Sequence, residues 1–305
     1  MILSKQFQKV LAYIENIQVP AGLAPQELGR VFYEQFIPLA GEKEAVHVIE
    51  EQVLTMESHS IPLRIYQPNE HQDQPTIIYF HGGWFNAGSL ATHDTPLRQL
   101  ANLSRATIIA VDYRLAPEHP FPAGLNDCAF AVQWIIDHAP SLGINSDHII
   151  LAGDSAGGAL CATVARKFRQ QIVAQLLIYP VTDNSLKTPS WTQFQNGPLL
   201  NLEGGIQAWD WYLPKEDQHN PDAVPLLADD LENLPPTFIG IAQYDPLRDE
   251  AIAYAEKLNS KGVKVSTKLY EGTTHGFFQM GGYVDDTQLL LQDMAAFIKS
   301  YNALA

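Results

Sequence analysis

The sequence predicts an α/β fold, in which a mostly parallel sheet is flanked by helices and covered by a helical cap. Short apolar runs typical of buried strands recur along the chain with helical stretches between them, and strands that alternate with helices form parallel sheets. Two segments, residues 1–45 and 182–225, interrupt this alternation. We therefore expect a core built from residues 46–181 and 226–305, with the two interrupting segments forming the cap.

The expected elements follow in chain order. Apolar and polar residues alternate at 46–54 and 61–67, and a turn separates the two runs. This pattern indicates an antiparallel opening of the sheet. The later strands are expected at residues 76–80, 107–111, 148–151, 174–179, 237–242 and 263–270. A helix precedes residue 148, because apolar residues recur there at 3.6-residue spacing, at Leu125, Cys128, Ala129, Val132, Ile135, Ile136 and Ala139.

The cap segments carry helical signal at residues 4–16, 25–36 and 202–213. The second segment is rich in aromatic residues, and an aromatic insertion between strands needs apolar surface to cover. We expect most of these rings to form the core of the cap and a minority to touch a ligand. The rings are Trp191, Phe194, Trp209, Trp211 and Tyr212.

Composition narrows the function classes. The 305 residues include 34 acidic and 19 basic side chains, and a net charge of −15 disfavours binding to nucleic acid and favours a small neutral ligand. The N-terminus lacks a secretion signal and no apolar run approaches the length that spans a bilayer, so we expect a cytoplasmic protein without a membrane partner. Cys128 and Cys161 lack metal or redox spacing, and we expect both to be buried in helices.

A nucleophile elbow is predicted at Ser155. The apolar run at residues 148–152 stops at Gly153, and Gly157 follows the serine. Only small neighbours fit around the residue at the apex of a sharp strand-to-helix turn, where the backbone is strained. The turn places Ser155 at the N-terminus of the next helix, where free amides favour negative charge.

Chain order then selects a base and an acid for Ser155. When such an elbow ends a strand of a parallel sheet, the triad runs in the order Ser, acid, His. His219 and His275 follow Ser155, and His219 lies in a polar run of the expected cap. His275 comes just after the last expected strand, so we take it as the base. Asp245 ends the preceding strand and is the expected acid, with Asp249 as the second choice.

The loop after residue 80 has the composition of an oxyanion loop. His81-Gly82-Gly83-Trp84-Phe85 follows an expected strand, and glycines let the backbone approach a substrate. We expect the amides of Gly83, Trp84 and Ala156 to bind the oxyanion. No metal or organic cofactor is expected, because neither a ligand cluster nor a phosphate-binding loop of the right form is present.

Together these blocks resemble the hormone-sensitive-lipase family of α/β-hydrolase carboxylesterases, also called bacterial family IV. The matching blocks, in the order found in the family, are His81-Gly82-Gly83, residues 112–123, residues 153–158, Asp245-Pro246-Leu247-Arg248-Asp249 and His275-Gly276-Phe277. The resemblance implies an α/β-hydrolase fold, a serine carboxylesterase with Ser155, Asp245 and His275 as its triad, and short or medium acyl esters as substrates. Because family members often dimerise through a sheet edge, it also makes a homodimer an option.

One position departs from the family. The family usually has a third glycine where this chain has Trp84, and we expect the indole to disfavour bulky esters. Gly82, Phe85 and Phe277 are expected at the substrate, although aromatic residues after a motif, Phe278 included, are core residues at least as often.

Other residues of the motifs are given no chemical step. Asp112, Arg114 and Glu118 are expected to form a network near the site, and His81 and His119 to hold loops by hydrogen bonds. Two alternatives to an esterase stay open. The same triad can attack an amide, as in an amidase or peptidase, and a non-catalytic small-molecule receptor can be built on this fold.

Overall fold

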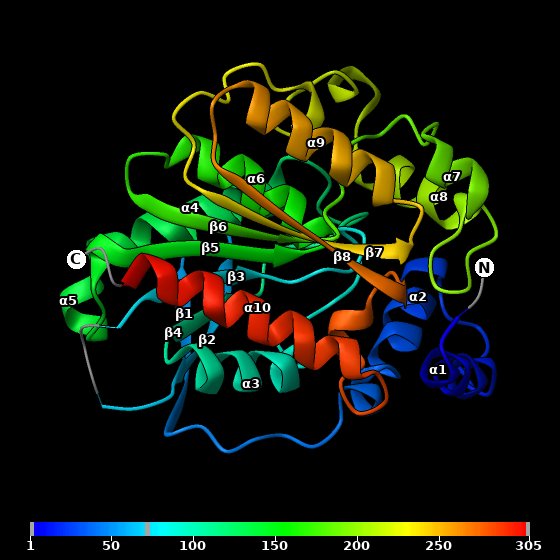
Figure 1. Cartoon of the computed structure of the whole chain (residues 1–305), viewed down its shortest axis with the longest axis horizontal. Coiled ribbons are helices and arrows are strands. Elements are labelled where there is room, and N and C mark those ends of the chain that lie inside the picture. Colours follow the sequence, from blue (N-terminus) through cyan, green and yellow to red (C-terminus); the bar gives the residue numbers. More distant parts are fainter. Residues whose placement is uncertain (1–2, 71–73, 303–305) are drawn as a thin grey trace.

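An eight-stranded sheet runs through the computed structural model, which describes residues 3–70 and 74–302 (Figure 1). The strand order is β1-β2-β4-β3-β5-β6-β7-β8. The first hairpin is antiparallel and also pairs with β4 in the antiparallel sense, whereas all pairs from β4 to β8 are parallel. The predicted fold class and antiparallel opening are confirmed.

The strands lie close to their predicted positions. Their bounds are β1 Val48–Thr55, β2 Ser60–Gln67, β3 Thr76–Phe80, β4 Thr107–Val111, β5 Ile149–Asp154, β6 Ile172–Ile178, β7 Thr237–Tyr244 and β8 Val265–Thr274. Strands β3 and β4 coincide with the predicted runs because both are fully buried and uniformly apolar apart from a threonine at the start. Strand β8 runs past its predicted end, since pairing with β7 resumes at Thr274 after an irregularity.

Helices cover both faces of the sheet (Figure 1). One face carries α4 (Ala123–Asp137), α6 (Ala156–Lys167) and α9 (Arg248–Ser260), and the other carries α3 (Asp94–Ser104) and α10 (Asp285–Asn302). The short helix α5 spans Ala139–Leu142. Single 3-10 turns lie at Ile37–Ala40, Ser146–His148, Lys215–Asp217, Pro225–Leu227 and Phe277–Gln279.

Helix α4 buries most of the face that its spacing predicted. Leu125, Cys128, Val132 and Ile135 are buried. The structure corrects the prediction at Ala129 and Ile136, which are half-buried, because the buried stripe turns toward Ala131 and includes a charged residue, Asp127.

The two interrupting segments meet at one end of the sheet. We call residues 3–45 the first cap segment and residues 182–225 the second. The first contains α1 (Lys5–Glu15) and α2 (Pro25–Glu34), and the second contains α7 (Pro189–Gln193) and α8 (Leu202–Tyr212). In Figure 1 these helices lie at the end toward which the arrowheads of β5 and β7 point. The carboxyl ends of the strands therefore face the cap segments.

The described residues bear on three expectations from composition. Cys128 and Cys161 are free and buried in helices, as predicted, and burial raises the pKa of both thiols. Within residues 3–70 and 74–302, no helix combines the length and apolar character needed to cross a membrane. The same residues contain no group of three or more His, Cys, Asp or Glu side chains that could hold a metal ion.

Candidate active site

Ser155 lies at the apex of a strained turn between β5 and α6. Its φ is 53° and its ψ −119°, a region that L side chains rarely adopt. A Cβ atom on Gly153 would overlap the carbonyl of Gly157, and one on Gly157 would overlap the carbonyl of Phe80. Glycine is therefore required on both sides of the serine, which is the geometry that the sequence predicted.

The hydroxyl of Ser155 reaches an imidazole that a carboxylate holds in place. Ser155 Oγ lies 2.9 Å from His275 Nε2, and His275 Nδ1 lies 2.8 Å from Asp245 Oδ2. The other oxygen of Asp245 accepts the amide of Leu247 at 2.9 Å. Asp245 is fully buried, so its orientation is fixed by these two bonds. The fold thus joins the three residues that chain order had selected.

The rejected candidates occupy other places. Asp249 accepts the amide of Ser190 at 2.8 Å, and it lies in the first turn of α9, where an acid complements the helix dipole. His219 is exposed in the second cap segment.

Three backbone amides beside Ser155 are free to bind an anion. Within the described residues, the amides of Gly83, Trp84 and Ala156 make no backbone or side-chain hydrogen bond. Ala156 is the first residue of α6, where amides lack intrahelical partners. Gly83 has φ 127° and Trp84 has φ 53°. Glycine adopts such positive φ values readily, whereas for tryptophan they are unfavourable.

A buried acid next to Ser155 anchors this loop, and sequence reasoning gave it no role. Asp154 Oδ1 accepts the amide of Gly82 and the hydroxyl of Tyr79, each at 2.8 Å, and lies 3.0 Å from His93 Nε2. Burial opposes ionisation of Asp154, but His93 and these donors outweigh it and lower its pKa. The signal available in the sequence was an acid directly before the elbow serine.

His81 supports the same loop, as predicted. Its Nδ1 donates to the carbonyl of Gly82 at 2.9 Å, its ring stacks on Tyr113 at 4.4 Å, and burial lowers its pKa to about 4. The matching expectation for His119 is wrong. That side chain is exposed and makes no hydrogen bond within the described part of the chain.

A cavity of about 280 Å3 opens beside Ser155 and His275. Its apolar wall comes from both cap segments, with Leu28, Phe32 and Phe36 from the first and Leu199, Ala208 and Trp211 from the second. Gly83 and Trp84 of the loop after β3 also line it. Of the five aromatic residues singled out in the second cap segment, Trp211 alone lines this cavity, which agrees with the expectation that a minority would.

Three residues expected at the substrate do not line this cavity. Gly82 lies behind the loop against Asp154. Phe85 is buried and stacks on Tyr212 at 3.7 Å, because the turn after Trp84 directs the ring into the core. Phe277 is fully buried against the rings of Tyr179 and Tyr270. The core interpretation of both aromatic residues, and of the buried Phe278, is correct.

The charged residues of the 112–123 block do not pair with one another. Arg114 forms two hydrogen bonds of 2.8 Å to Asp127. Glu118 receives Arg30 of α2 at 2.5 and 3.0 Å. Asp112 faces His81 at 3.9 Å, and burial raises its pKa. The expected single network is therefore wrong, because each of these side chains pairs with a residue from a different part of the chain.

A second serine, histidine and aspartate lie in contact elsewhere in the fold. Ser58 Oγ is 3.0 Å from His59 Nδ1, and His59 Nε2 is 2.8 Å from Asp127 Oδ1. Here Arg114 also binds the aspartate, and Ser58 is exposed on a turn. Contact among a serine, a histidine and an aspartate is not enough for an active site. The strained elbow and the free amides are found at Ser155, so we take Ser155 as the candidate.

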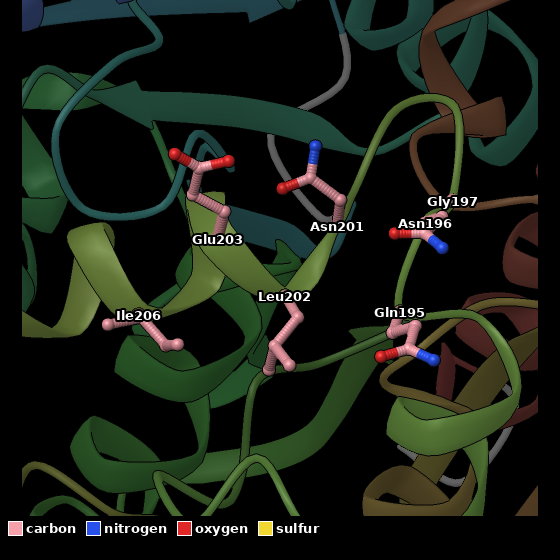
Figure 2. Close-up of a pocket in the computed structure, with 7 residues that line it drawn as sticks. All are labelled: Gln195, Asn196, Gly197, Asn201, Leu202, Glu203 and Ile206. Atoms are coloured by element: carbon pink, nitrogen blue, oxygen red, sulfur yellow. The ribbon is translucent and has the colours of Figure 1, made fainter.

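Another hollow, of about 490 Å3, lies beside the start of α8 (Figure 2). Its lining combines three amide side chains and Glu203 with the aliphatic side chains of Leu202 and Ile206. Figure 2 shows Asn201 and Glu203 extending to one side of the chain and Leu202 to the other, so no group of reactive atoms converges there.

Comparison with known proteins identifies the family. Residues 77–279 match the family model described as alpha/beta hydrolase fold. Esterase LipI of Mycobacterium tuberculosis is 41% identical over 233 residues, which is 73% of either chain. The ethyl acetate hydrolase of Pseudomonas putida is 34% identical over 280 residues, 87% of this chain and 86% of its own.

Solved structures agree with the sequence comparison. A hyperthermophilic esterase from the archaeon Pyrobaculum calidifontis is 34% identical and superposes over 100% of both chains with a TM-score of 0.92. The chain therefore belongs to the α/β-hydrolase fold family. Within that superfamily it is a carboxylesterase of the type that resembles hormone-sensitive lipase.

Proposed function

We propose that this carboxylic ester hydrolase cleaves short- to medium-chain acyl esters through an acyl-enzyme on Ser155. The observation that carries the proposal is the continuous contact from Asp245 through His275 to Ser155, which ends at a cavity of about 280 Å3. A serine hydroxyl is a weak nucleophile until a base removes its proton, and this contact supplies the base.

In the first half of the reaction, His275 Nε2 takes the proton of Ser155 as Oγ attacks the ester carbonyl carbon. Asp245 Oδ2 accepts Nδ1–H, which fixes the tautomer and stabilises the imidazolium that forms. The carbonyl oxygen becomes an oxyanion, and the amides of Gly83, Trp84 and Ala156 bind it. His275 then gives the proton to the leaving alkoxide, and the alcohol departs.

In the second half, water attacks the acyl-enzyme. His275 takes a proton from the water, the same amides bind the second oxyanion, and the collapse of this intermediate returns the proton to Ser155 Oγ. An acid leaves, and every proton that His275 accepts is donated again. One water molecule is consumed in this second half, and both halves then balance.

The cavity supports a small, neutral ester. Its wall is mainly apolar, which suits an acyl chain, and the acidic surface of the protein disfavours anionic ligands. We propose that the two cap segments act together as this wall, since residues of both α2 and α8 line it. The limited volume favours short or medium acyl chains over long ones.

Replacing Ser155 by alanine tests the proposal. We expect Ser155→Ala to lose hydrolysis of p-nitrophenyl esters by about a thousandfold or more, because a triad acts as a unit. Ser58→Ala is the matched control, since it removes the serine of the other His–Asp contact. A panel from p-nitrophenyl acetate to palmitate should show the highest kcat/KM at the short to medium esters.

Three results would contradict the proposal. Full activity of Ser155→Ala would mean that Ser155 is not the nucleophile. Loss of activity in Ser58→Ala would indicate that Ser58 is the nucleophile instead. If the p-nitroanilide of the same acyl group were hydrolysed as fast as the p-nitrophenyl ester, the protein would be an amidase and not an esterase.

A further inference from the structure

A buried acid on the core side of the cap has no part in the triad. Glu250 lies in the first turn of α9 and is fully buried. Its Oε1 accepts the amides of Thr182 at 2.8 Å and Asp183 at 3.2 Å, and its Oε2 accepts Trp191 Nε1 at 2.9 Å. All three donors belong to the second cap segment.

A purely structural explanation of Glu250 is weak. Burial of a carboxyl group is costly, and a well-packed apolar side chain often stabilises such a position as well or better. What a carboxyl group adds is direction, because its oxygens fix where each donor must lie. Glu250 thus determines where the second cap segment leaves the core.

Trp191 transmits that position to the cavity. Its indole is 1% exposed, and the ring centroid lies 6.3 Å from that of Trp84. On α8, a Cβ atom at Gly205 would lie 2.8 Å from the far edge of the ring. One side chain therefore contacts α9 of the core, the oxyanion loop and the helix that lines the cavity.

The neighbouring contacts hold the same short helix. Ser190 donates its amide to Asp249 at 2.8 Å and its hydroxyl to the carbonyl of Pro246 at 2.6 Å. The segment that begins at the proposed acid, Asp245, therefore binds α7 through two of its residues, Pro246 and Asp249. These bonds make α7 a rigid support for Trp191.

The contacts of Trp191 matter because Trp84 occupies a backbone region that it does not favour. At φ 53° a bulky residue persists only where its surroundings hold it. Trp84 lines the cavity, and its free amide is one of the proposed oxyanion donors. A shift of Trp191 would alter the space beside the ester carbonyl.

We propose that Glu250 is a positioning residue that, through Trp191, fixes Trp84 and α8 and so determines how much bulk next to the ester carbonyl the cavity admits. The inference rests on the proposed esterase function. The reacting atoms touch neither Glu250 nor Trp191.

Two conservative variants remove the hydrogen bond between Glu250 and Trp191, one by changing the acceptor and one by changing the donor. Glu250→Gln keeps the size and one acceptor oxygen, but its amide nitrogen has no lone pair for Trp191 N–H. Trp191→Phe keeps an aromatic ring and removes the N–H. Tyr254→Phe is the matched control, because this buried ring lies one turn further along α9.

The measurement compares p-nitrophenyl acetate with p-nitrophenyl pivalate, which share a leaving group and differ in bulk at the carbonyl. We expect both variants to raise the pivalate-to-acetate ratio of kcat/KM by about tenfold, the scale of pocket discrimination between small apolar groups. Tyr254→Phe should leave the ratio unchanged. The double variant should match the single variants, because both act through one contact.

Three outcomes separate the possibilities. A ratio unchanged in folded Glu250→Gln and Trp191→Phe, or effects that simply multiply in the double variant, would overturn the positioning role. If Glu250→Gln does not fold, the ratio of Trp191→Phe decides. A wild-type protein that does not cleave p-nitrophenyl acetate would overturn the esterase proposal, whereas Ser155-dependent cleavage with an unmoved ratio would overturn this inference alone.

Discussion

At the scale of single residues, the site is built on strained backbone that its neighbours hold. Ser155 and Trp84 both have φ 53°, and such conformations cost roughly 1–3 kcal/mol each. The amide of Ser155 donates to Ile178 at 2.8 Å, and the carbonyl of Gly83 accepts the amide of Ala87 at 2.8 Å. These bonds keep Ser155, the proposed nucleophile, and the proposed oxyanion loop in place before a substrate arrives.

Trp84 gives the residue-scale prediction. Trp84→Gly removes the strain and opens space at the cavity wall, so we expect a higher ratio of tertiary- to primary-alcohol ester hydrolysis. Trp211→Ala, which opens the wall of α8 instead, should not reproduce this change. The prediction fails if the ratio of kcat/KM for the two ester types stays the same in Trp84→Gly.

Chain order and motif spacing were enough to predict the contact among Ser155, Asp245 and His275. The roles of Asp154 and Glu250 were not predicted, because the burial of both depends on segments distant in sequence. Gly82 and Tyr79 surround the first, and Thr182 and Trp191 the second. Hydrophobic periodicity carries no information about an acid that distant loops bury.

At the scale of elements, one arginine secures a wall of the cavity. Arg30 of α2 donates to the carbonyls of Asn86 at 2.8 Å and Ala116 at 3.0 Å and pairs with Glu118. Helix α2 lines the cavity with Leu28 and neighbouring residues. The first cap segment is thus held to the core beside the oxyanion loop.

Loss of these bonds should loosen α2 and leave the triad intact. For Arg30→Gln we expect a higher KM for p-nitrophenyl butyrate and hexanoate and a nearly unchanged kcat. Lys9→Gln on α1, an exposed position, is the charge-matched control. A fall in kcat with constant KM would contradict the assignment of Arg30 to the wall.

Element prediction succeeded where burial was uniform and failed where the element was short. Strands β3 and β4 were predicted to the residue, since their apolar runs are uninterrupted. Helix α7 has five residues and was missed, because one turn and a half is too short for a periodic pattern. Its position comes from contacts with the loop after Asp245.

At the scale of the whole molecule, two buried groups make stability depend on pH in opposite directions. Burial lowers the pKa of His81 from 6.5 to about 4, so unfolding takes up a proton between these values and stability rises with pH there. Burial raises the pKa of Glu250 from 4.5 to about 8, against its hydrogen-bond donors. Unfolding then releases a proton, and stability falls as pH rises toward 8.

Between about pH 6.5 and pH 8, Glu250 affects the pH dependence of the free energy of unfolding without the opposing effect of His81. We expect the free energy of unfolding of the wild type to fall in this window, relative to Glu250→Gln, by at most about 1.4 kcal/mol per pH unit. Urea unfolding of both proteins across the window measures the difference. Curves that stay parallel would contradict a raised pKa at Glu250.

The central claim is that Ser155 is the nucleophile of an esterase, and covalent labelling tests it most directly. The protein is treated with a fluorophosphonate, and intact mass and peptide mapping locate the adduct. The account predicts one phosphonyl group on Ser155, formed rapidly and in step with loss of p-nitrophenyl acetate hydrolysis. An adduct on another residue, or full inhibition without an adduct on Ser155, would contradict it.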